Sequence, residues 1–349
     1  MALYVDVEKT FPDFRLSVQL EGEDEVVALL GSSGCGKSLT LKCIAGIEKP
    51  DKGRIVINGE VVFDSKERVN LPPQKRRVGY LFQNYALFPT MTVWNNIASV
   101  IKKPKSEKHN IVDDIIKKFG LEGVKKLYPR QISGGQQQRA ALARILVSQP
   151  KILMLDEPFS ALDTHLKWRM EQEVAAVLTE FDGTTVFVSH NRDEVYRLCD
   201  RIAVMHEGKV ETIGAKTEIF EMPKTLTVAM MTGCKNISQA EKSGEYSVVA
   251  TDWGIELKTE HPVPNTVKYV GVRAHHFKRT YELEGGENVF TCRIHKVIDE
   301  PFERVFVFSF GESMAKLQFE VSKDISAQWG DEDFTIYISP DKINCLEGG

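Results

Sequence analysis

The sequence predicts an α/β domain built on a parallel sheet, followed by a smaller all-β domain. The first two thirds of its 349 residues alternate short apolar runs with amphipathic helical segments, the pattern of a sheet covered by helices. The last third has short strand-like runs separated by Gly, Asp and Glu turns, which favours a small barrel of OB type. We therefore expect two domains, at residues 1–233 and 234–349.

Within the first domain, three apolar runs are predicted to be buried strands: "EVVALLG" (25–31), "KILMLDEP" (151–158) and "TTVFVSH" (184–190). Two further stretches are typical of hairpins, "RIVINGEVVF" with its Asn58-Gly59 turn and "RIAVMHEGKVET". The stretch from about 85 to 150 has helical periodicity and little strand signal. It predicts a helical subdomain inserted in the α/β domain.

Composition narrows the class of protein. A net charge of −4 argues against a large nucleic-acid footprint, so no nucleic-acid partner is expected. The six cysteines contain no C-x-x-C pair, which indicates reduced thiols rather than a zinc site or a disulfide framework. No apolar run approaches the roughly 20 residues that span a bilayer, and the N-terminal stretch lacks the features of a secretory signal. We expect the protein to stay in the cytosol.

The octapeptide "GSSGCGKS" (31–38) is the complete G-x-x-x-x-G-K-[ST] pattern and stands between a predicted strand and a predicted helix, which is the context that a phosphate-binding loop requires. Its glycines let the backbone wrap around phosphate, Lys37 supplies a cation for the β- and γ-phosphate oxygens, and the Ser38 hydroxyl can ligate Mg²⁺. The motif predicts a P-loop nucleotide site.

Polar residues end three other apolar runs. Asp156 and Glu157 close the second buried strand, where Asp156 can join the Mg²⁺ shell and Glu157 can face an attacking water as general base. His190 closes the third strand and is expected to contact the γ-phosphate. Gln83 closes a short run before the helical subdomain, and its amide can reach Mg²⁺ or water.

A second phosphate cradle occurs in "QISGGQQQR" (131–139), where Ser133 and two glycines precede a predicted helix. Unpaired N–H groups and the helix dipole favour an anion at such a place.

Together, these segments resemble the nucleotide-binding subunits of ABC transporters. In chain order they correspond to Walker A ("GSSGCGKS"), Q-loop ("LFQN"), signature ("ISGGQ"), Walker B ("LMLDE"), D-loop ("SALD") and switch histidine ("SH"). Two departures are Ile132, where leucine is usual in the signature, and Leu39, where a second hydroxyl residue often follows the P-loop serine.

The resemblance implies an ATPase that works as a head-to-tail homodimer, in which the signature of one subunit completes the ATP site of the other. Adenine stacking is assigned by resemblance to Phe11, with Phe14 as the alternative. The implied catalytic residues are Glu157, His190 and Gln83, and the implied Mg²⁺ ligands are Ser38, Gln83 and Asp156. The implied ATP contacts are Phe11, Ser32, Ser33, Gly34, Cys35, Gly36, Lys37, Ser38, Leu39, Ser133, Gly134, Gly135, Gln136 and Asp163.

The tail after residue 233 resembles the regulatory barrel (TOBE/MOP-like) of importer ATPases. "VGVRAHHF" matches the family's pattern except at Ala274 and His275, and "TGCKNIS" (232–238) looks most like ATPases of molybdate importers, with a simple linker as the alternative. The implied function is uptake of an oxyanion, molybdate or tungstate before sulfate. Import of a polyamine, a sugar or iron is the alternative, and a soluble ABC protein of DNA repair or translation is the rival class. The barrel itself is a further candidate oxyanion site.

The resemblance also implies partners. Membrane permease subunits would dock in a groove beside the Q-loop, where Tyr85 and Phe88 are either groove-lining or core residues. An extracytoplasmic solute-binding protein would take part indirectly. The protein would then lie on the inner face of the cell membrane.

Overall fold

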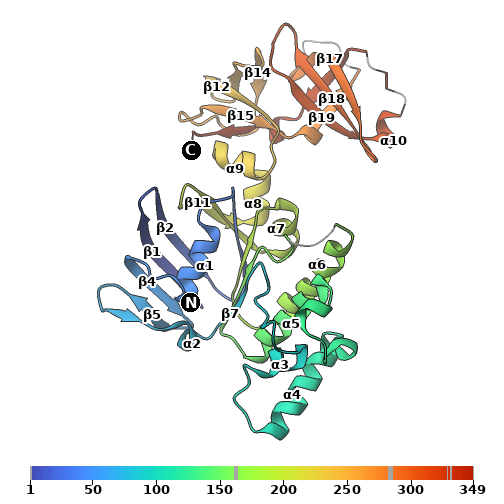
Figure 1. Ribbon diagram of the computed structural model, residues 1–349. Helices are drawn as coiled ribbons and strands as arrows, with labels where there is room; N and C mark the ends of the chain where they lie inside the picture. The colour runs from blue at the N-terminus through green and yellow to red at the C-terminus, as the bar shows by residue number, and fades with distance from the viewer. Residues whose placement is uncertain (1, 161–163, 282–285, 328, 331, 349) are drawn as a thin grey trace. The chain divides into compact units, whose positions relative to one another are not determined.

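Figure 1 shows the computed structural model, which describes residues 2–160, 164–281, 286–327, 329–330 and 332–348. The chain divides into two compact units, Met1–Lys216 and Thr217–Gly349. From the sequence we placed this boundary at 233. It lies earlier because the segment after Lys216 is bound to the C-terminal strands: the Leu226 N–H donates to the Glu347 carbonyl, and Ala229 packs against Leu346.

One mixed sheet is the centre of the first unit. In chain order its described strands are β1 (Leu3–Phe11), β2 (Phe14–Gly22), β3 (Val26–Gly31), β4 (Lys52–Ile57), β5 (Glu60–Asp64), β6 (Val69–Asn70), β7 (Val78–Leu81), β8 (Ile152–Asp156), β9 (Thr185–Ser189), β10 (Arg201–His206) and β11 (Lys209–Ala215). The spatial order is β6-β5-β4-β1-β2-β11-β10-β3-β9-β8-β7. Neighbours from β10 to β7 are parallel, as the continuous apolar runs predict.

In the rest of this sheet the neighbouring strands are antiparallel, except that β11 is parallel to β2. Both predicted hairpins are confirmed, β4–β5 and β10–β11, and both turn through residues with positive φ, Asn58-Gly59 and Glu207-Gly208. The hairpin β1–β2 was not predicted, because its alternating pattern is broken by the Pro12-Asp13 turn rather than by an Asn-Gly signal.

Helices follow several strands of the first unit. They are α1 (Lys37–Ala45), α2 (Pro73–Arg76), α3 (Val93–Ala98), α4 (Lys105–Lys118), α5 (Gly134–Val147), α6 (Thr164–Glu180) and α7 (Arg192–Leu198), with short 3₁₀ turns at Glu122–Val124 and Pro129–Gln131. Between β7 and β8 the described residues form helices and turns but no strand (Figure 1). Side chains of α3, α4 and α5 share a hydrophobic cluster. The predicted fold class, a P-loop α/β domain with a helical insertion and an all-β tail, is confirmed.

The second unit contains two five-stranded sheets in its described residues. Their orders are β14-β13-β12-β15-β21 and β16-β20-β17-β18-β19. The strands are β12 (Asn236–Gly244), β13 (Ser247–Ala250), β14 (Ile255–Lys258), β15 (Tyr269–Val272), β16 (Phe277–Thr280), β17 (Val289–Asp299), β18 (Glu303–Phe310), β19 (Leu317–Ser322), β20 (Phe334–Ile338) and β21 (Asn344–Leu346). The helices are α8 (Lys216–Glu221), α9 (Leu226–Met231) and α10 (Lys323–Ser326), with 3₁₀ turns at Ala274–His276 and Pro340–Lys342.

We expected one small barrel here, and the structure instead divides the strands between two sheets. Both sheets contribute to a single hydrophobic cluster, which includes Val270 from the first and Phe306 and Ile336 from the second. The segment "TGCKNIS" is not a linker, because Asn236 begins β12. Its side-chain amide donates to the carbonyls of Val272 and Gln318.

No helix in the described ranges is long and apolar enough to cross a membrane. All six cysteines are free, as predicted, and five of them are buried. Burial raises the pKa of the Cys43 thiol to about 12 and of Cys345 to about 11, so these thiols stay protonated at neutral pH.

Candidate active site

The polar residues predicted from separate motifs follow four adjacent parallel strands. β3, β9, β8 and β7 are consecutive in the sheet. The P-loop follows β3, His190 follows β9, Glu157 follows β8 and Gln83 follows β7. Because ligands bind at the carboxyl ends of parallel strands, this edge of the sheet is a single candidate site.

The P-loop has the conformation that anion binding requires. Gly34 and Gly36 have φ of 82° and 106°, which side-chain-bearing residues rarely adopt, and a Cβ atom on Gly36 would lie 2.6 Å from Leu16 Cδ1. Helix α1 begins at Lys37 with no side-chain cap, so its first N–H groups remain directed at the loop. Lys37 is 5% exposed, and its Nζ donates to the carbonyls of Gly31 and Ser32, both at 2.8 Å.

Ser38 and Asp156 meet beside this loop. The Ser38 hydroxyl donates to Asp156 Oδ1 at 2.8 Å, and the Tyr80 hydroxyl donates to Asp156 Oδ2 at 2.9 Å. Burial, together with the Asp156 charge, raises the pKa of Tyr80, so Tyr80 remains a donor. A hydroxyl and a carboxylate are hard oxygen ligands of the kind Mg²⁺ prefers. Among the described residues, no group of three or more His, Cys, Asp or Glu side chains is arranged to hold a metal ion.

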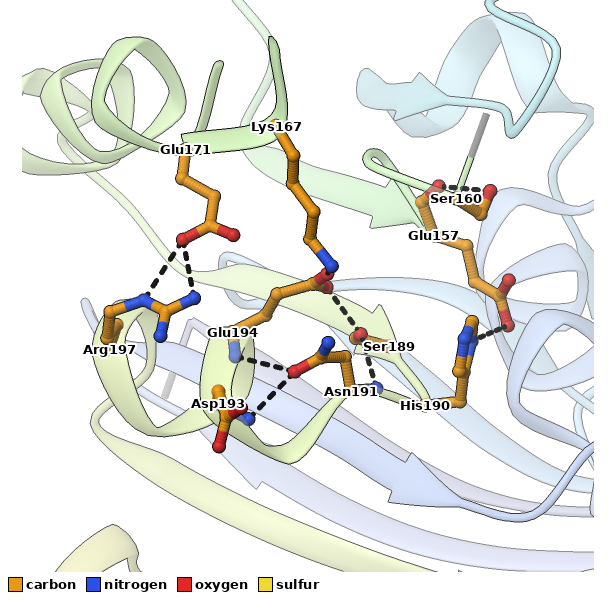
Figure 2. Close-up of polar contacts among 10 residues, drawn as sticks. All are labelled: Glu157, Ser160, Lys167, Glu171, Ser189, His190, Asn191, Asp193, Glu194 and Arg197. Atoms are coloured by element: carbon orange, nitrogen blue, oxygen red, sulfur yellow. Dashed lines mark hydrogen bonds and ion pairs between the residues drawn. The ribbon is translucent and has the colours of Figure 1, made fainter. Parts of the chain in front are cut away.

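Glu157 and His190 face each other, as Figure 2 shows, with His190 Nδ1 3.3 Å from Glu157 Oε1. Glu157 has φ of 45°, a left-handed conformation at the end of β8. Gln83 reaches the same place, because its Nε2 donates to Ser160 Oγ at 3.1 Å and Ser160 Oγ donates to the Glu157 carbonyl at 2.9 Å. Ser160 therefore links the Gln83 side chain to the backbone of Glu157, and the Glu157 side chain separately contacts His190.

The predicted signature residues lie elsewhere in the first unit. Ser133 caps α5: its Oγ accepts from the Gln136 N–H at 3.3 Å, and Gln136 Oε1 accepts from the Ser133 N–H at 2.9 Å. Within the described part of the chain, no hydrogen bond or ion pair joins these two residues to the P-loop. The Ser133 hydroxyl accepts in this cap, so its own proton stays available for a ligand.

Several other predicted contacts are now placed. Phe11 is 37% exposed, with Lys9 Nζ 5.5 Å from its ring centre, whereas Phe14 packs against the core. The Cys35 side chain belongs to the core, and the partly buried side chain of Leu39 packs against it. Asp163 lies outside the described residues.

The two aromatic residues after the Q-loop have different environments. Tyr85 is buried, whereas Phe88 is exposed beneath the Arg144 guanidinium, which lies 5.4 Å from its ring centre. Nearby residues of α3 and α4 line a cavity of about 530 Å³, with Trp94 and Met91 among its walls.

Sequence reasoning missed three polar residues of this site: Tyr80, Ser189 and Glu194. Tyr80 lies within an apolar run and gave no signal. Glu194 lies four residues after His190, on α7, and its carboxylate accepts a hydrogen bond from Ser189 at 2.6 Å (Figure 2). An acidic residue one helical turn beyond a strand-end histidine was the available signal.

Comparison with known proteins agrees with this geometry. A family model described as "ABC transporter" matches residues 15–160. The spermidine/putrescine import ATP-binding protein PotA of Nostoc sp. is 38% identical over 269 residues, covering 74% of this chain and 69% of that protein. The protein of the same name from Rubrobacter xylanophilus is 37% identical over 307 residues, covering 84% and 79%.

Two solved structures are similar to the first unit. A dimeric post-hydrolysis state of the ATP-binding cassette MJ0796, bound to ADP and Pi, has a TM-score of 0.53 and 28% identity, and it covers 62% of this chain and 99% of that one. CbiO1 of Clostridium perfringens, part of the ABC transporter complex cbiONQ, has a TM-score of 0.53 and 29% identity, covering 63% and 90%.

Proposed function

This chain belongs to the ATP-binding subunits of ABC transporters of the importer type, and we propose that the solute whose uptake it energises is a polyamine. Membership of this family makes it an ATPase that binds ATP with Mg²⁺ and couples hydrolysis to transport. Four neighbouring parallel strands end at one edge of the sheet, and the residues that follow them form the proposed ATP-hydrolysing site. This observation supports the proposed catalytic roles.

The substrate class is supported by relatives that extend beyond the ATPase unit. Two relatives named for spermidine/putrescine import match 74% and 84% of this chain. Our oxyanion expectation rested on residues 232–238 together with a single compact barrel, and polar side chains of this segment make structural contacts. Arg273 donates to the Thr232 hydroxyl at 3.0 Å, and the Asn236 amide donates to the carbonyls of Val272 and Gln318. We therefore prefer the polyamine alternative.

We assign the catalytic roles as follows. Lys37 and the P-loop N–H groups would bind the β- and γ-phosphates. Ser38, Asp156 and Gln83 would hold Mg²⁺, which when bound neutralises charge on the phosphate oxygens. Glu157 would accept a proton from the attacking water as the bond between the γ-phosphorus and ADP breaks, and His190 would contact the γ-phosphate.

The signature would act on a second copy of the chain. The proton of the Ser133 hydroxyl is available because this oxygen accepts within its cap, and Gly134 and Gly135 are the first residues of α5, whose first N–H groups have no acceptor within the helix. In a head-to-tail homodimer, Ser133, Gly134, Gly135, Gln136 and Asp163 would complete the partner's ATP site. Closure would then require two bound nucleotides.

Permease subunits would dock on the helical subdomain. The cavity lined by Met91 and Trp94, together with the exposed ring of Phe88, offers apolar surface for an inserted permease segment. An extracytoplasmic solute-binding protein would deliver the polyamine to the permease. This arrangement would put the chain in the cytoplasm, on the inner face of the membrane.

The substrate can be tested by measuring solute uptake in cells whose only copy of this ATP-binding subunit is the chain described here. Replacing it with the Glu157→Gln variant should abolish energy-dependent uptake of labelled spermidine or putrescine and leave molybdate uptake unchanged. Loss of molybdate uptake with normal polyamine uptake would overturn the polyamine proposal in favour of the oxyanion. Exposed Glu180→Gln, at the far end of α6, is the matched control.

A further inference from the structure

Glu194 is a buried carboxylate beside the predicted switch histidine. It is 4% exposed, and both of its oxygens are bound. Oε2 accepts from the Ser189 hydroxyl at 2.6 Å, and Oε1 lies 2.5 Å from Lys167 Nζ (Figure 2). A buried charge is tolerated when it is paired and hydrogen-bonded, and this carboxylate meets both conditions.

The residues on both sides of His190 form hydrogen bonds with Glu194, Ser189 with its carboxylate and Asn191 with its backbone N–H. Ser189 ends β9, and its hydroxyl donates to Glu194 while accepting from the Asn191 N–H at 2.9 Å. Asn191 Oδ1 in turn accepts from the N–H groups of Asp193 and Glu194, at 2.9 and 3.2 Å, and so caps α7. His190 itself is exposed and has one described side-chain partner in this view, Glu157 (Figure 2).

We propose that Glu194 is a positioning residue for ATP hydrolysis: through Ser189 it holds the backbone that aims His190 at Glu157. The inference rests on the catalytic role proposed above for His190. Glu194 touches neither His190 nor Glu157, so its effect is indirect and passes through the backbone at 189–191.

Lys167 links Glu194 to another helix, α6. It lies in the first turn of α6, which begins at Thr164, directly after the predicted D-loop. Its ammonium neutralises Glu194 within a half-buried site. A change in the position of the start of α6 is therefore transmitted to the His190 turn by one ion pair and one hydrogen bond.

The chain offers a matched control on the same two helices. Arg197 of α7 binds Glu171 of α6, with Nε and Nη2 at 3.0 and 2.7 Å from Oε2, and Glu171 is 2% exposed (Figure 2). This pair fastens α7 to α6 but does not contact Ser189. Loosening the helices without disturbing the His190 turn is therefore possible with Arg197→Met.

The test measures steady-state ATPase activity of the full chain, with its permease where activity requires it. Ser189→Ala and Glu194→Gln should lower kcat about tenfold, while the KM for ATP stays within about twofold of wild type. Ser189→Thr keeps the hydroxyl and should restore kcat. Arg197→Met should lower the melting temperature and leave kcat unchanged; an equal fall in its kcat would show that general helix packing, not the Ser189 contact, is responsible.

A double-mutant cycle with His190 gives the decisive result. If Glu194 acts through His190, then Glu194→Gln has no further effect on kcat in a His190→Ala background. If the double variant instead loses kcat by the product of the two single losses, the inference is overturned. If His190→Ala alone has wild-type kcat, the proposed role of His190 is refuted. If His190→Ala lowers kcat but Glu194→Gln and Ser189→Ala do not, only the positioning role of Glu194 is refuted. None of these outcomes depends on which solute is transported.

Discussion

Ser38 Oγ donates a hydrogen bond to Asp156 Oδ1 at 2.8 Å, although 118 positions separate the two residues in the sequence. The contact brings together a hydroxyl and a carboxylate, two oxygen groups of the kind that would hold Mg²⁺ in the proposed site. We expect Asp156→Asn to raise the Mg²⁺ concentration for half-maximal ATPase activity at least about tenfold, because the charged ligand is lost. Titration of activity with Mg²⁺ measures this. Unchanged Mg²⁺ dependence would contradict the assignment, and Asp182→Asn, at a surface turn, is the control.

Tyr80→Phe should destabilise the protein by about 1–2 kcal/mol, because Asp156 Oδ2 loses its buried donor. The midpoint of urea unfolding of the full chain reports this change. Tyr246→Phe removes a hydroxyl from an exposed tyrosine and should leave the midpoint unchanged. If Tyr80→Phe has the same unfolding midpoint as the wild type, a water molecule replaces the lost hydroxyl with no change in the free energy of unfolding.

Glu157→Gln should keep ATP binding and lower kcat by about 10²–10⁴, because the amide cannot accept the proton of the attacking water. ATP that is bound but not hydrolysed should then trap a dimer. The dimer would elute earlier in gel filtration than the monomer, and only when ATP and Mg²⁺ are present. If the variant hydrolyses ATP normally, Glu157 is not the general base. If it stays monomeric with ATP, the ATP-dependent dimer is ruled out.

Phe11→Ala and Phe14→Ala should have different effects. Phe11 is exposed and available for stacking, so its loss should weaken binding of an ATP analogue about tenfold. Phe14 packs against the core, so its loss should lower the melting temperature instead. Fluorescence titration with a labelled nucleotide and thermal unfolding, run on both variants, separate the two effects; the reverse pattern would assign stacking to Phe14.

His276 should make the second unit less stable as the pH falls. Burial, with smaller effects of His275, Lys342 and Arg273, lowers the pKa of His276 to about 4 from an ordinary 6.5. The unfolded chain therefore binds more protons between these values, so the free energy of unfolding decreases as the pH falls from about 6.5 to about 4. His276→Asn should flatten this part of the profile, measured by urea unfolding at several pH values. His261→Asn, at the surface of the same unit, should not.

Motif order was enough to predict the P-loop, the strand ends and the helical insertion, because each depends on local chemistry: glycines with positive φ, continuous apolar runs, and helical periodicity. The β1–β2 hairpin, the two-sheet division of the tail and the boundary at Lys216 could not be predicted in this way. They depend on which distant strands pair, and a single sequence does not contain that information.

The sequence by itself determined the residue types of the site: a lysine and serine after one strand, two carboxylates after another, and a histidine after a third. Only the tertiary structure decided that Glu157 and His190 face each other at 3.3 Å and that the Ser189 hydroxyl donates to the buried carboxylate of Glu194. The physical reason is that strand order and helix packing bring these groups together. A buried carboxylate such as Glu194 shows its role only when its partners are seen.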